Sequence, residues 1–309
     1  MTHNRNGIAF AKLAMMAGIA ALSTGLANAQ NTPIGIPYQL THSYNYDNSL
    51  SPDGKQMVFI KYFEGREQLF IMNADGRGEK QLTRADANHE DPAWSSDGTR
   101  IAFVKLENGS SIIHTINIDG TGEKAITPPD VKAIHPVWST DSRTLWYNNV
   151  SDLRPPEKNE AQIQTIDLAT GAIESPVSDG VNTYPSLSPD GTMIAFRKII
   201  DGNNSEVFIA KADGTNQKNL TNNPAFEGWP EWSPDGKRIA FAANRNSNYQ
   251  IFLMNADGSN VQLAANTDGR ATVPRWSRDG KTLYFTNCKN VDFRRSCEIM
   301  QMPVERDSQ

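Results

Sequence analysis

Six positions spaced along the chain carry side chains that could bind a ligand or move a proton. Each lies four residues before the serine of a repeated turn, and they are Asp47, Asp91, His135, Tyr184, Trp229 and Val273. The carboxylates and the imidazole could accept hydrogen bonds or serve as general acid and base. Tyr184 and Trp229 offer large, rigid surfaces that suit binding. The pattern predicts a site with a hydrogen-bonding side and an aromatic side.

A second set of side chains lies two positions earlier in each copy. Its members are Asn45, His89, Ala133, Asn182, Glu227 and Ala271. Residues two apart in a strand point to the same face, so we expect this set to reach the same opening. The predicted binding residues are therefore Asp47, His89, Asp91, His135, Tyr184, Glu227 and Trp229. The alternative is a water-filled opening that holds no ligand.

Histidines at three neighbouring copies raise the question of a metal site. The three histidines lie at different distances before their turns, nine residues for His42, six for His89 and four for His135. Their side chains should therefore lie at different depths along the channel. The chain has no G-x-S-x-G, no P-loop and no G-x-G-x-x-G, and "HEDPA" at His89 lacks the second histidine of H-E-x-x-H. We therefore expect no catalytic residue, no bound metal and no cofactor.

The turn that fixes these positions is written six times. The copies are "SPDG" at Ser51, "SSDG" at Ser95, "STDS" at Ser139, "SPDG" at Ser188 and at Ser233, and "SRDG" at Ser277. The intervals are 44, 44, 49, 45 and 44 residues, and a period of about 40–45 residues is typical of propeller blades. The repeated Asp and Gly are expected to be structural, with the carboxylate folded onto the turn amides.

Each copy can be divided into four strands rich in Val, Ile, Phe and Thr. The fourth is short, as in "KQLT" (80–83) and "KNLT" (218–221). After the sixth turn the chain has room for two further strands only, while "YQLT" (38–41) near the N-terminus offers the missing one. The sequence thus predicts an all-β, six-bladed β-propeller with four antiparallel strands per blade, the last blade being completed by the N-terminal strand.

Strand counting separates two faces of such a disc. The S-x-D-G and A-D-G turns fall on one face and are short and repetitive, so they should be structural. The loops between second and third strands, together with those that join one blade to the next, fall on the other face and vary in length and composition, as binding loops do. The longest runs from Asn148 to Ala161 and is either a stiff projection or a tolerated insertion. We expect the binding site at the channel mouth on this variable face.

Residues 1–29 are expected to be a secretory signal peptide cleaved near Ala29–Gln30. Arg5 and Lys12 precede the apolar run "LAMMAGIAAL" and the small-residue site "ANA". Residues 30–309 should then form one propeller domain. With 28 basic and 35 acidic residues after the leader and no basic cluster, the mature chain is a poor candidate for nucleic acid.

Two cysteines are present, Cys288 and Cys297. In an oxidising compartment an isolated pair of this kind predicts a disulfide rather than a metal site. Cys288 ends a second strand and Cys297 begins the neighbouring third strand, so the bond would clamp one hairpin in the closing blade.

The pattern P-x-W-S-x-D-G…I-A-F…I-F-x-M-N-A-D-G…Q-L-T resembles the propeller domain of the TolB family, periplasmic proteins of the Tol–Pal envelope system. The resemblance covers essentially all of residues 38–304. TolB proteins carry an α/β domain before the propeller, whereas here about eight residues separate the cleavage site from the first strand. What that domain does is therefore not implied for this chain.

The combined expectation is a periplasmic or secreted, monomeric, non-enzymatic binding or scaffold protein. Its partner would be a protein or peptide of the cell envelope, bound at the channel mouth, with no nucleic acid and no membrane insertion. The alternative is a carbohydrate-active lyase or hydrolase with its site in the central channel. Propellers host both kinds of activity, so convergence of the acids and histidines discriminates between them.

Overall fold

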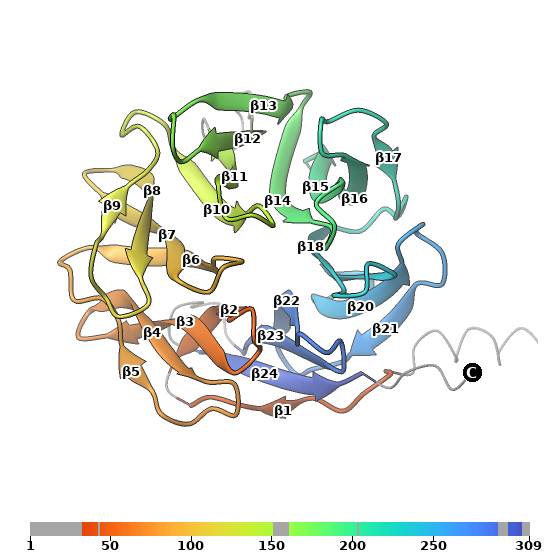
Figure 1. Ribbon diagram of the computed structural model, residues 1–309. Helices are drawn as coiled ribbons and strands as arrows, with labels where there is room; N and C mark the ends of the chain where they lie inside the picture. Colours follow the sequence, from red (N-terminus) through yellow and green to blue (C-terminus); the bar gives the residue numbers. More distant parts are fainter. Residues whose placement is uncertain (1–32, 43, 151–160, 203, 290–295, 305–309) are drawn as a thin grey trace, which may run out of the picture. The chain divides into compact units, whose positions relative to one another are not determined.

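Antiparallel sheets are arranged in a ring around a central axis (Figure 1). The structure is a computed structural model that describes residues 33–42, 44–150, 161–202, 204–289 and 296–304. The expected leader and residues 151–160 of the long loop lie outside these ranges. Every regular element of the described residues is a strand, which confirms the all-β prediction.

The first two repeats each form a separate four-stranded sheet. The first sheet contains β2 (Asn45–Leu50), β3 (Gln56–Phe63), β4 (Arg66–Asn73) and β5 (Lys80–Gln81). The second contains β6 (Asn88–Trp94), β7 (Arg100–Glu107), β8 (Ser110–Asn117) and β9 (Lys124–Ala125). In both sheets the strands run in chain order, so consecutive strands form hairpins.

The third and fourth repeats share one eight-stranded sheet. It holds β10 (Ala133–Trp138), β11 (Thr144–Val150), β12 (Ala161–Asp167), β13 (Ile173–Val177), β14 (Val181–Leu187), β15 (Met193–Asp201), β16 (Asn204–Lys211) and β17 (Lys218–Asn219). Its halves, β10–β13 and β14–β17, are joined where β12 and β14 run parallel and Ala161 pairs with Val181. The described residues therefore give four separate four-stranded sheets and one eight-stranded sheet, so the propeller arrangement is confirmed, whereas the predicted count of six blades is not matched by six separate sheets.

The fifth and sixth repeats are again separate sheets. The fifth contains β18 (Glu227–Trp232), β19 (Arg238–Ala243), β20 (Gln250–Asn255) and β21 (Gln262–Ala265). The sixth contains β22 (Arg270–Trp276), β23 (Thr282–Cys288), β24 (Cys297–Pro303) and, as its outer strand, β1 (Tyr38–Gln39). The innermost strands β2, β6, β10, β14, β18 and β22 contact one another in sequence, and β22 contacts β2. The ring is therefore closed.

The repeated turn is held by a small set of hydrogen bonds that recurs in each copy. In the first copy the Ser51 hydroxyl donates to Asp53 Oδ1 (2.6 Å) and accepts from the Gln56 amide (2.9 Å). Asp53 Oδ1 also accepts from the Lys55 amide (3.0 Å), as expected for a structural carboxylate. Gly54 takes a φ of 71°, a region that glycine enters without strain.

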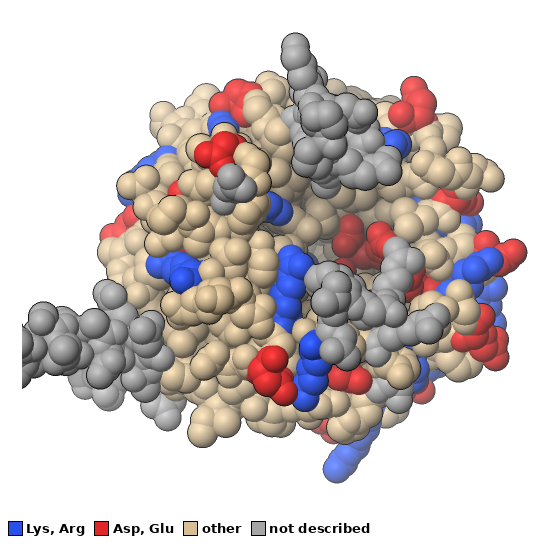
Figure 2. Space-filling model, turned by 180° about the vertical axis from the view of Figure 1, so that it is seen from behind, with Lys and Arg blue, Asp and Glu red and all other residues tan. Residues whose placement is uncertain are grey.

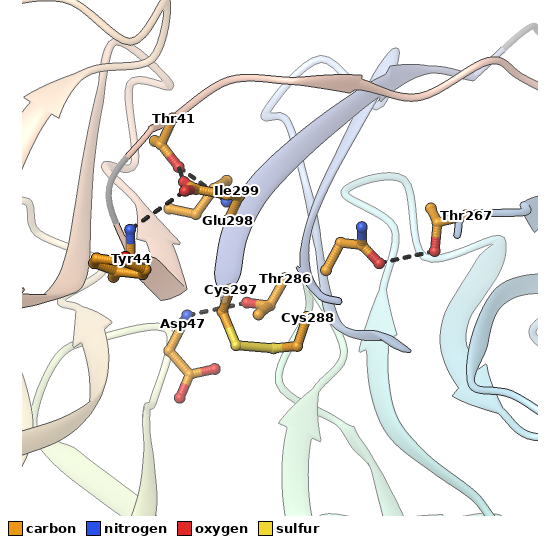
Figure 3. Close-up of a disulfide and its surroundings, with 10 residues drawn as sticks. Thr41, Tyr44, Asp47, Thr267, Thr286, Cys288, Cys297, Glu298 and Ile299 are labelled. Atoms are coloured by element: carbon orange, nitrogen blue, oxygen red, sulfur yellow. Dashed lines mark hydrogen bonds between the residues drawn. A yellow bond between two sulfur atoms is a disulfide. The ribbon is translucent and has the colours of Figure 1, made fainter. Parts of the chain in front are cut away.

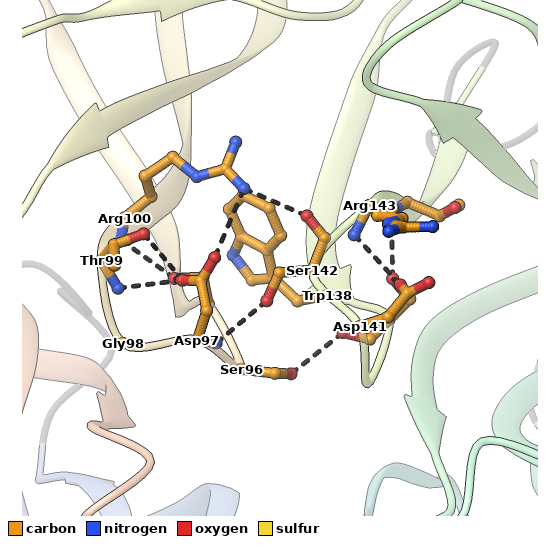
Figure 4. A network of polar contacts seen from close by, with 12 residues as sticks. Ser96, Asp97, Gly98, Thr99, Arg100, Trp138, Asp141, Ser142 and Arg143 are labelled. Atoms are coloured by element: carbon orange, nitrogen blue, oxygen red, sulfur yellow. Dashed lines mark hydrogen bonds and ion pairs between the residues drawn. The ribbon is translucent and has the colours of Figure 1, made fainter.

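Neighbouring turns are also tied to each other (Figure 4). The Asp97 amide donates to the Ser142 hydroxyl (3.0 Å), and the Arg100 guanidinium donates to the Ser142 carbonyl (3.0 Å). The same guanidinium lies 4.7 Å from the centre of the Trp138 ring. Ser142 stands where the other copies have glycine and has a φ of 58°. Its side chain thus supplies a link between blades at a position that is strained for a residue with a Cβ atom.

Two aromatic series fill the core. One residue of each second strand is fully buried at the same position: Phe59, Phe103, Tyr147, Phe196, Phe241 and Phe285. The tryptophan that precedes the turn packs between sheets, since Trp94 joins Val58 and Ile60 of the first repeat to Ile101 of the second. Burial of such side chains contributes roughly 2–3 kcal/mol each. Packing between blades, not ligand binding, therefore explains the repeated tryptophan.

The N-terminal strand closes the sixth sheet, as the sequence predicted. Tyr38 pairs with Gln301 and Gln39 with Met300. Beyond the strand, the Thr41 hydroxyl accepts from the Ile299 amide (3.0 Å) and donates to the Glu298 carboxylate (2.9 Å) (Figure 3). The first and last segments of the described chain are thereby joined in one sheet.

The predicted disulfide is also present. Cys288 and Cys297 face each other directly across β23 and β24, with their Cα atoms 4.0 Å apart, and are bonded (Figure 3). The bond closes a short hairpin in the same sheet that β1 completes. In the entropic account, a loop of about ten residues gains roughly 2–3 kcal/mol from such a link. The sixth sheet is therefore stabilised both by its pairing with β1 and by the disulfide.

His89, one of the predicted binding residues, lies in the core of the second sheet. Its side chain is fully buried, its Nδ1 is 3.0 Å from the Thr83 hydroxyl, and its ring stands edge-on to Phe103 at 5.0 Å. His114 lies against the same phenylalanine at 5.7 Å and contacts Glu123. Burial lowers the pKa of His89 to about 4 and also lowers the pKa of His114. Both histidines are therefore neutral structural residues near pH 7.

Removing the Thr41 hydroxyl should weaken ring closure. Thr41→Val keeps the side-chain volume but leaves the Ile299 amide without its acceptor, so we expect the free energy of unfolding to fall by roughly 1–3 kcal/mol. Thr83→Val is the matched control because the Thr83 hydroxyl accepts from the Leu69 amide (3.0 Å) within one ordinary blade. Urea denaturation would measure both. A loss for Thr83→Val alone would contradict closure by the N-terminal segment.

Acid should destabilise the fold through His89. Between pH 6.5 and 4 the unfolded chain binds a proton at this histidine while the folded chain does not, so stability falls as pH falls, by up to about 3 kcal/mol. His89→Asn introduces the residue found at the equivalent positions Asn45 and Asn182. It should reduce the slope of the free energy of unfolding against pH. Urea denaturation at pH 4.5 and 7 would test it, with exposed His42→Asn as the control. An unchanged slope in His89→Asn would refute this role.

Candidate functional site

A β-bulge in each innermost strand positions the site. The six residues that lie four before the turn serine, here called the ring residues, all have positive φ: Asp47 (40°), Asp91 (50°), His135 (54°), Tyr184 (54°), Trp229 (53°) and Val273 (54°). The pairing register shifts around each of them, as between Glu90 and Ala93 on β6. A bulge adds one residue and turns the strand locally. Two adjacent residues of each strand can therefore face the channel.

The ring residues separate two cavities along the channel. A cavity of about 340 Å³ is lined by the ring residues and by preceding residues such as Tyr46, Glu90 and Ile134. It reaches Cys288 and Cys297, at the loop end of the sixth sheet. A cavity of about 40 Å³ is lined by the ring residues and the residues that follow them, such as Asn48 and Pro92. The larger cavity, here called the mouth cavity, thus opens toward the variable loops.

Two carboxyl groups meet on one side of the mouth cavity. Asp47 and Asp91 lie close enough for a hydrogen bond between their carboxyl groups, which forms only when one of them carries a proton. Burial, followed by the charge of Asp91, raises the pKa of Asp47 to about 8, against the opposing effect of Arg275. The Asp47 amide donates to the Thr286 hydroxyl (3.0 Å), and its carboxyl group points away from the disulfide (Figure 3). The sixth sheet therefore holds this backbone in place.

His135 extends the polar side. Its amide donates to Asp91 Oδ2 (3.1 Å), and its Nε2 lies 3.6 Å from the same oxygen. Its Nδ1 is 2.7 Å from Asn148 Oδ1, which also accepts from the Tyr184 amide (3.4 Å). Because that oxygen can only accept, Nδ1 carries the hydrogen. Burial lowers the pKa of His135, so the imidazole is neutral with its Nε2 lone pair toward Asp91.

A continuous aromatic stack forms the other side. The rings of His135 and Tyr184 are 3.8 Å apart, those of Tyr184 and Trp229 are 5.0 Å apart, and Tyr249 meets Trp229 edge-on at 5.5 Å. The Arg270 guanidinium lies 4.3 Å from the Tyr249 ring and 5.7 Å from the Trp229 ring. Contacts of these kinds between rings and cations hold the side chains in place. The aromatic side is therefore also basic.

A second arginine, Arg197, contacts this aromatic stack. The Arg197 guanidinium lies 5.8 Å from both the Trp229 and the Phe226 rings. A Cβ atom added at Gly228 would come 2.8 Å from Arg197 Cδ, so a larger residue there would shift the arginine side chain. Figure 2 shows the face carrying the central hollow, with acidic side chains on one side of the hollow and basic ones on the other.

The bulge explains which predicted residues meet. Asp47, Asp91, His135, Tyr184 and Trp229 all line the mouth cavity. His89 and Glu227 do not, although we predicted that they would. In a regular strand, a ring residue and the residue two positions before it would point to the same face. The bulge breaks this alternation, so the earlier residue points into the blade and not into the channel. The prediction was wrong for these two because it assumed a regular strand.

Glu227 makes a buried ion pair instead. Its side chain is fully buried and accepts from Arg245 Nε at 2.5 Å. Burial raises its pKa, and Arg245 opposes that rise. Its backbone is held by Ser205, whose hydroxyl donates to the Glu227 carbonyl (2.9 Å). The residue therefore fastens β16 to β18 and plays no part in the channel.

Other channel residues were missed from the sequence. Tyr46, Glu90 and Arg270 line the mouth cavity, but no glycine or asparagine at the positive-φ positions signals the bulge that turns them inward. Three histidines considered for a metal do not meet either: His42 contacts Gln39, His89 lies in a blade and His135 lines the channel. Within the described ranges no group of three or more His, Cys, Asp or Glu side chains is placed to hold a metal.

The part of the chain that the structure describes contains no helix long and apolar enough to cross a membrane.

A TolB protein from Agrobacterium tumefaciens superposes with a TM-score of 0.62 at 19% identity, over 70% of this chain and 76% of that chain. Oligogalacturonate lyase from Vibrio parahaemolyticus gives a TM-score of 0.57 at 15% identity, over 88% and 94% of the two chains. At these identities the likeness shows the shared fold alone.

Dipeptidyl-peptidase 5 from Porphyromonas gingivalis is 38% identical over 61 residues, which are 18% of this chain and 9% of that protein. This chain therefore matches only a small part of that relative's length. The family model described as the TolB beta propeller domain matches residues 39–155 and 154–309, nearly the whole length that the structure describes. With its repeated turns, its ring of antiparallel sheets and its channel, the chain belongs to the TolB beta propeller domain family.

Proposed function

We propose that this protein is a non-enzymatic binding protein that captures a protein or peptide partner at the mouth cavity. The observation that carries the proposal is the rigid aromatic stack of Tyr184, Trp229 and Tyr249 opposite the Asp47–Asp91 pair. Rigid aromatic groups bury large surfaces at low entropic cost and commonly dominate protein interfaces. The carboxyl groups would orient the partner by accepting its hydrogen bonds.

The turn face is a poorer candidate for binding. Its serine hydroxyls and aspartate carboxylates are already used within each turn, as at Ser233 and Asp235, where the hydroxyl–carboxylate distance is 2.6 Å. Hydrogen bonds from Ser233 and from the Lys237 amide lower the pKa of Asp235. A partner would have to break these bonds to use the same groups. The mouth cavity offers groups that do not hold the turns together.

The carboxyl geometry argues against a glycoside hydrolase. Hydrolases of that kind keep their two carboxyl groups about 5–10 Å apart, with the sugar between them. Asp47 and Asp91 are close enough to share a proton. A sugar could not sit between them without opening the channel. Of the two enzyme alternatives, a carbohydrate-active hydrolase is therefore less favoured than a lyase.

A lyase acting on an acidic sugar is the second candidate. One observation favours it: the neutral imidazole of His135 presents Nε2 beside Asp91, as a general base could. Arg270 in the same cavity could hold a substrate carboxylate. Oligogalacturonate lyase shares the fold, but at an identity that carries no activity across. Incubation with acidic oligosaccharides, read by ultraviolet absorbance of the unsaturated product, would distinguish a lyase from a binding protein.

The proposed setting is the cell envelope. The leader-like residues 1–29 would direct export with cleavage near Ala29–Gln30, leaving residues 30–309 as one monomeric propeller. The Cys288–Cys297 disulfide supports such a compartment, because disulfides persist where the surroundings are oxidising. The partner would then be another envelope protein.

Variants at the mouth should weaken partner capture without unfolding the protein. A photoreactive aromatic residue replacing Tyr184 should crosslink an envelope protein in intact cells, whereas the same residue replacing exposed Lys237 on the turn face should not. Trp229→Ala and Asp91→Asn should each reduce capture of that partner at least tenfold while the melting temperature shifts by only a few degrees. Asn tolerates the positive φ at position 91.

Asp235→Ala on the turn face should show the opposite behaviour. It loses a turn carboxylate that accepts from Ser233 and Lys237, so stability should fall by about 1 kcal/mol while capture stays normal. If both mouth variants capture the partner normally and Asp235→Ala does not, the site lies on the other face.

A further inference from the structure

The mouth cavity has a one-sided charge. Asp47, Glu90 and Asp91 line the wall made by the first two repeats. Arg270, from the sixth repeat, is the one basic side chain among the described residues that line this cavity. Tyr46, Tyr184 and Trp229 add aromatic rings to the lining, and Ile134 adds an aliphatic side chain. The cavity is therefore acidic at one end and aromatic along its sides.

The acidic wall holds a proton that a cation could replace. Three carboxyl groups lie close together in a partly enclosed space, and their mutual repulsion is relieved when Asp47 is protonated. A positive group placed at the Asp47–Asp91 pair would relieve the same repulsion and would accept both carboxylates as hydrogen-bond partners. The aromatic walls suit the methylene stem of a long basic side chain and attract its charged end.

We propose that the partner inserts a lysine or arginine side chain into the mouth cavity, with its charged end at Asp47 and Asp91 and its stem against Tyr184 and Trp229. This inference rests on the proposed binding function and names the chemistry that the site recognises. A volume of about 340 Å³ admits a side chain of this size but not a folded element. Arg270 lies against the Tyr249 and Trp229 rings, so its charge disfavours a second cation there and favours placing the charged end at the carboxyl pair.

Binding of this kind is linked to pH. Asp47 must release its proton to pair with the cation, so affinity should rise as pH increases toward 8 and above. The charged and titratable groups around Asp47 are Tyr46, Glu90, Asp91, His135, Tyr184, Arg270 and Arg275. Arginine keeps its charge over this range, and burial lowers the pKa of His135, so the change between pH 7 and 9 reports on the carboxyl pair.

The test uses three capped tripeptides, acetyl-Gly-X-Gly-amide, in which X is arginine, norleucine or glutamate. Dissociation constants are measured by NMR titration of the oxidised protein at pH 7 and 9. We expect the arginine peptide to bind at least tenfold more tightly than the norleucine peptide at pH 9. Its affinity should fall by up to about tenfold at pH 7, because about a tenth of a group with a pKa near 8 is ionised there.

Two variants separate the site from general electrostatic attraction. Asp91→Asn should remove the preference for arginine over norleucine. Glu64→Gln removes one charge from an exposed turn between β3 and β4 that does not line the cavity, and it should leave the preference unchanged. Equal binding of the three peptides, preference for the glutamate peptide, no binding, or equal losses in both variants would each overturn the inference.

Failure of this inference can be distinguished from failure of the binding function. If the peptides show no preference for arginine but Trp229→Ala still abolishes crosslinking of the envelope partner, the site binds a partner through other chemistry. If Trp229→Ala and Asp91→Asn leave crosslinking intact, the binding function itself is wrong. The two experiments therefore report on separate steps of the argument.

Discussion

The left-handed residue in each innermost strand is the constraint on which the channel depends. A regular strand would send every second side chain to the axis, whereas the bulge sends two adjacent ones, such as Glu90 and Asp91. Positive φ costs roughly 1–2 kcal/mol for a residue with a Cβ atom, and Val273 is β-branched as well. The conformation recurs whether the residue is Asp, His, Tyr, Trp or Val. The bulge therefore belongs to the fold, whereas the side chain that it presents varies from repeat to repeat.

The two faces of the ring use polar groups in opposite ways. On the turn face each serine and aspartate is engaged locally, and neighbouring turns are tied through contacts such as Asp97 to Ser142. These bonds hold the geometry of every repeat. Inside the mouth cavity, burial and the neighbouring charge of Asp91 raise the pKa of Asp47 to about 8. The bonds that hold the turns and the groups of the proposed binding site thus lie at different ends of the same strands.

Fold and activity separate clearly in this architecture. A TolB protein and an oligogalacturonate lyase superpose on the chain with TM-scores of 0.62 and 0.57, so the scaffold alone cannot distinguish binding from catalysis. Activity has to be argued from the set of side chains presented at the axis. Here that set places a proton-sharing carboxyl pair opposite a stack of Tyr184, Trp229 and Tyr249. The proposed ligand chemistry therefore rests on a few residues carried by a shared fold.

The sequence by itself determined the repeat, the turns, the closing strand and the disulfide, because each rests on local chemistry written at fixed spacing. Thr41 and Cys297 could be placed from their neighbours alone. Only the tertiary structure decided which side chains reach the channel. His89 and Glu227 turned into the blades, and Tyr46, Glu90 and Arg270 turned inward, because the bulge depends on pairing between strands and leaves no glycine as a signal. The parallel contact that joins the third and fourth sheets is likewise a property of packing, not of any motif.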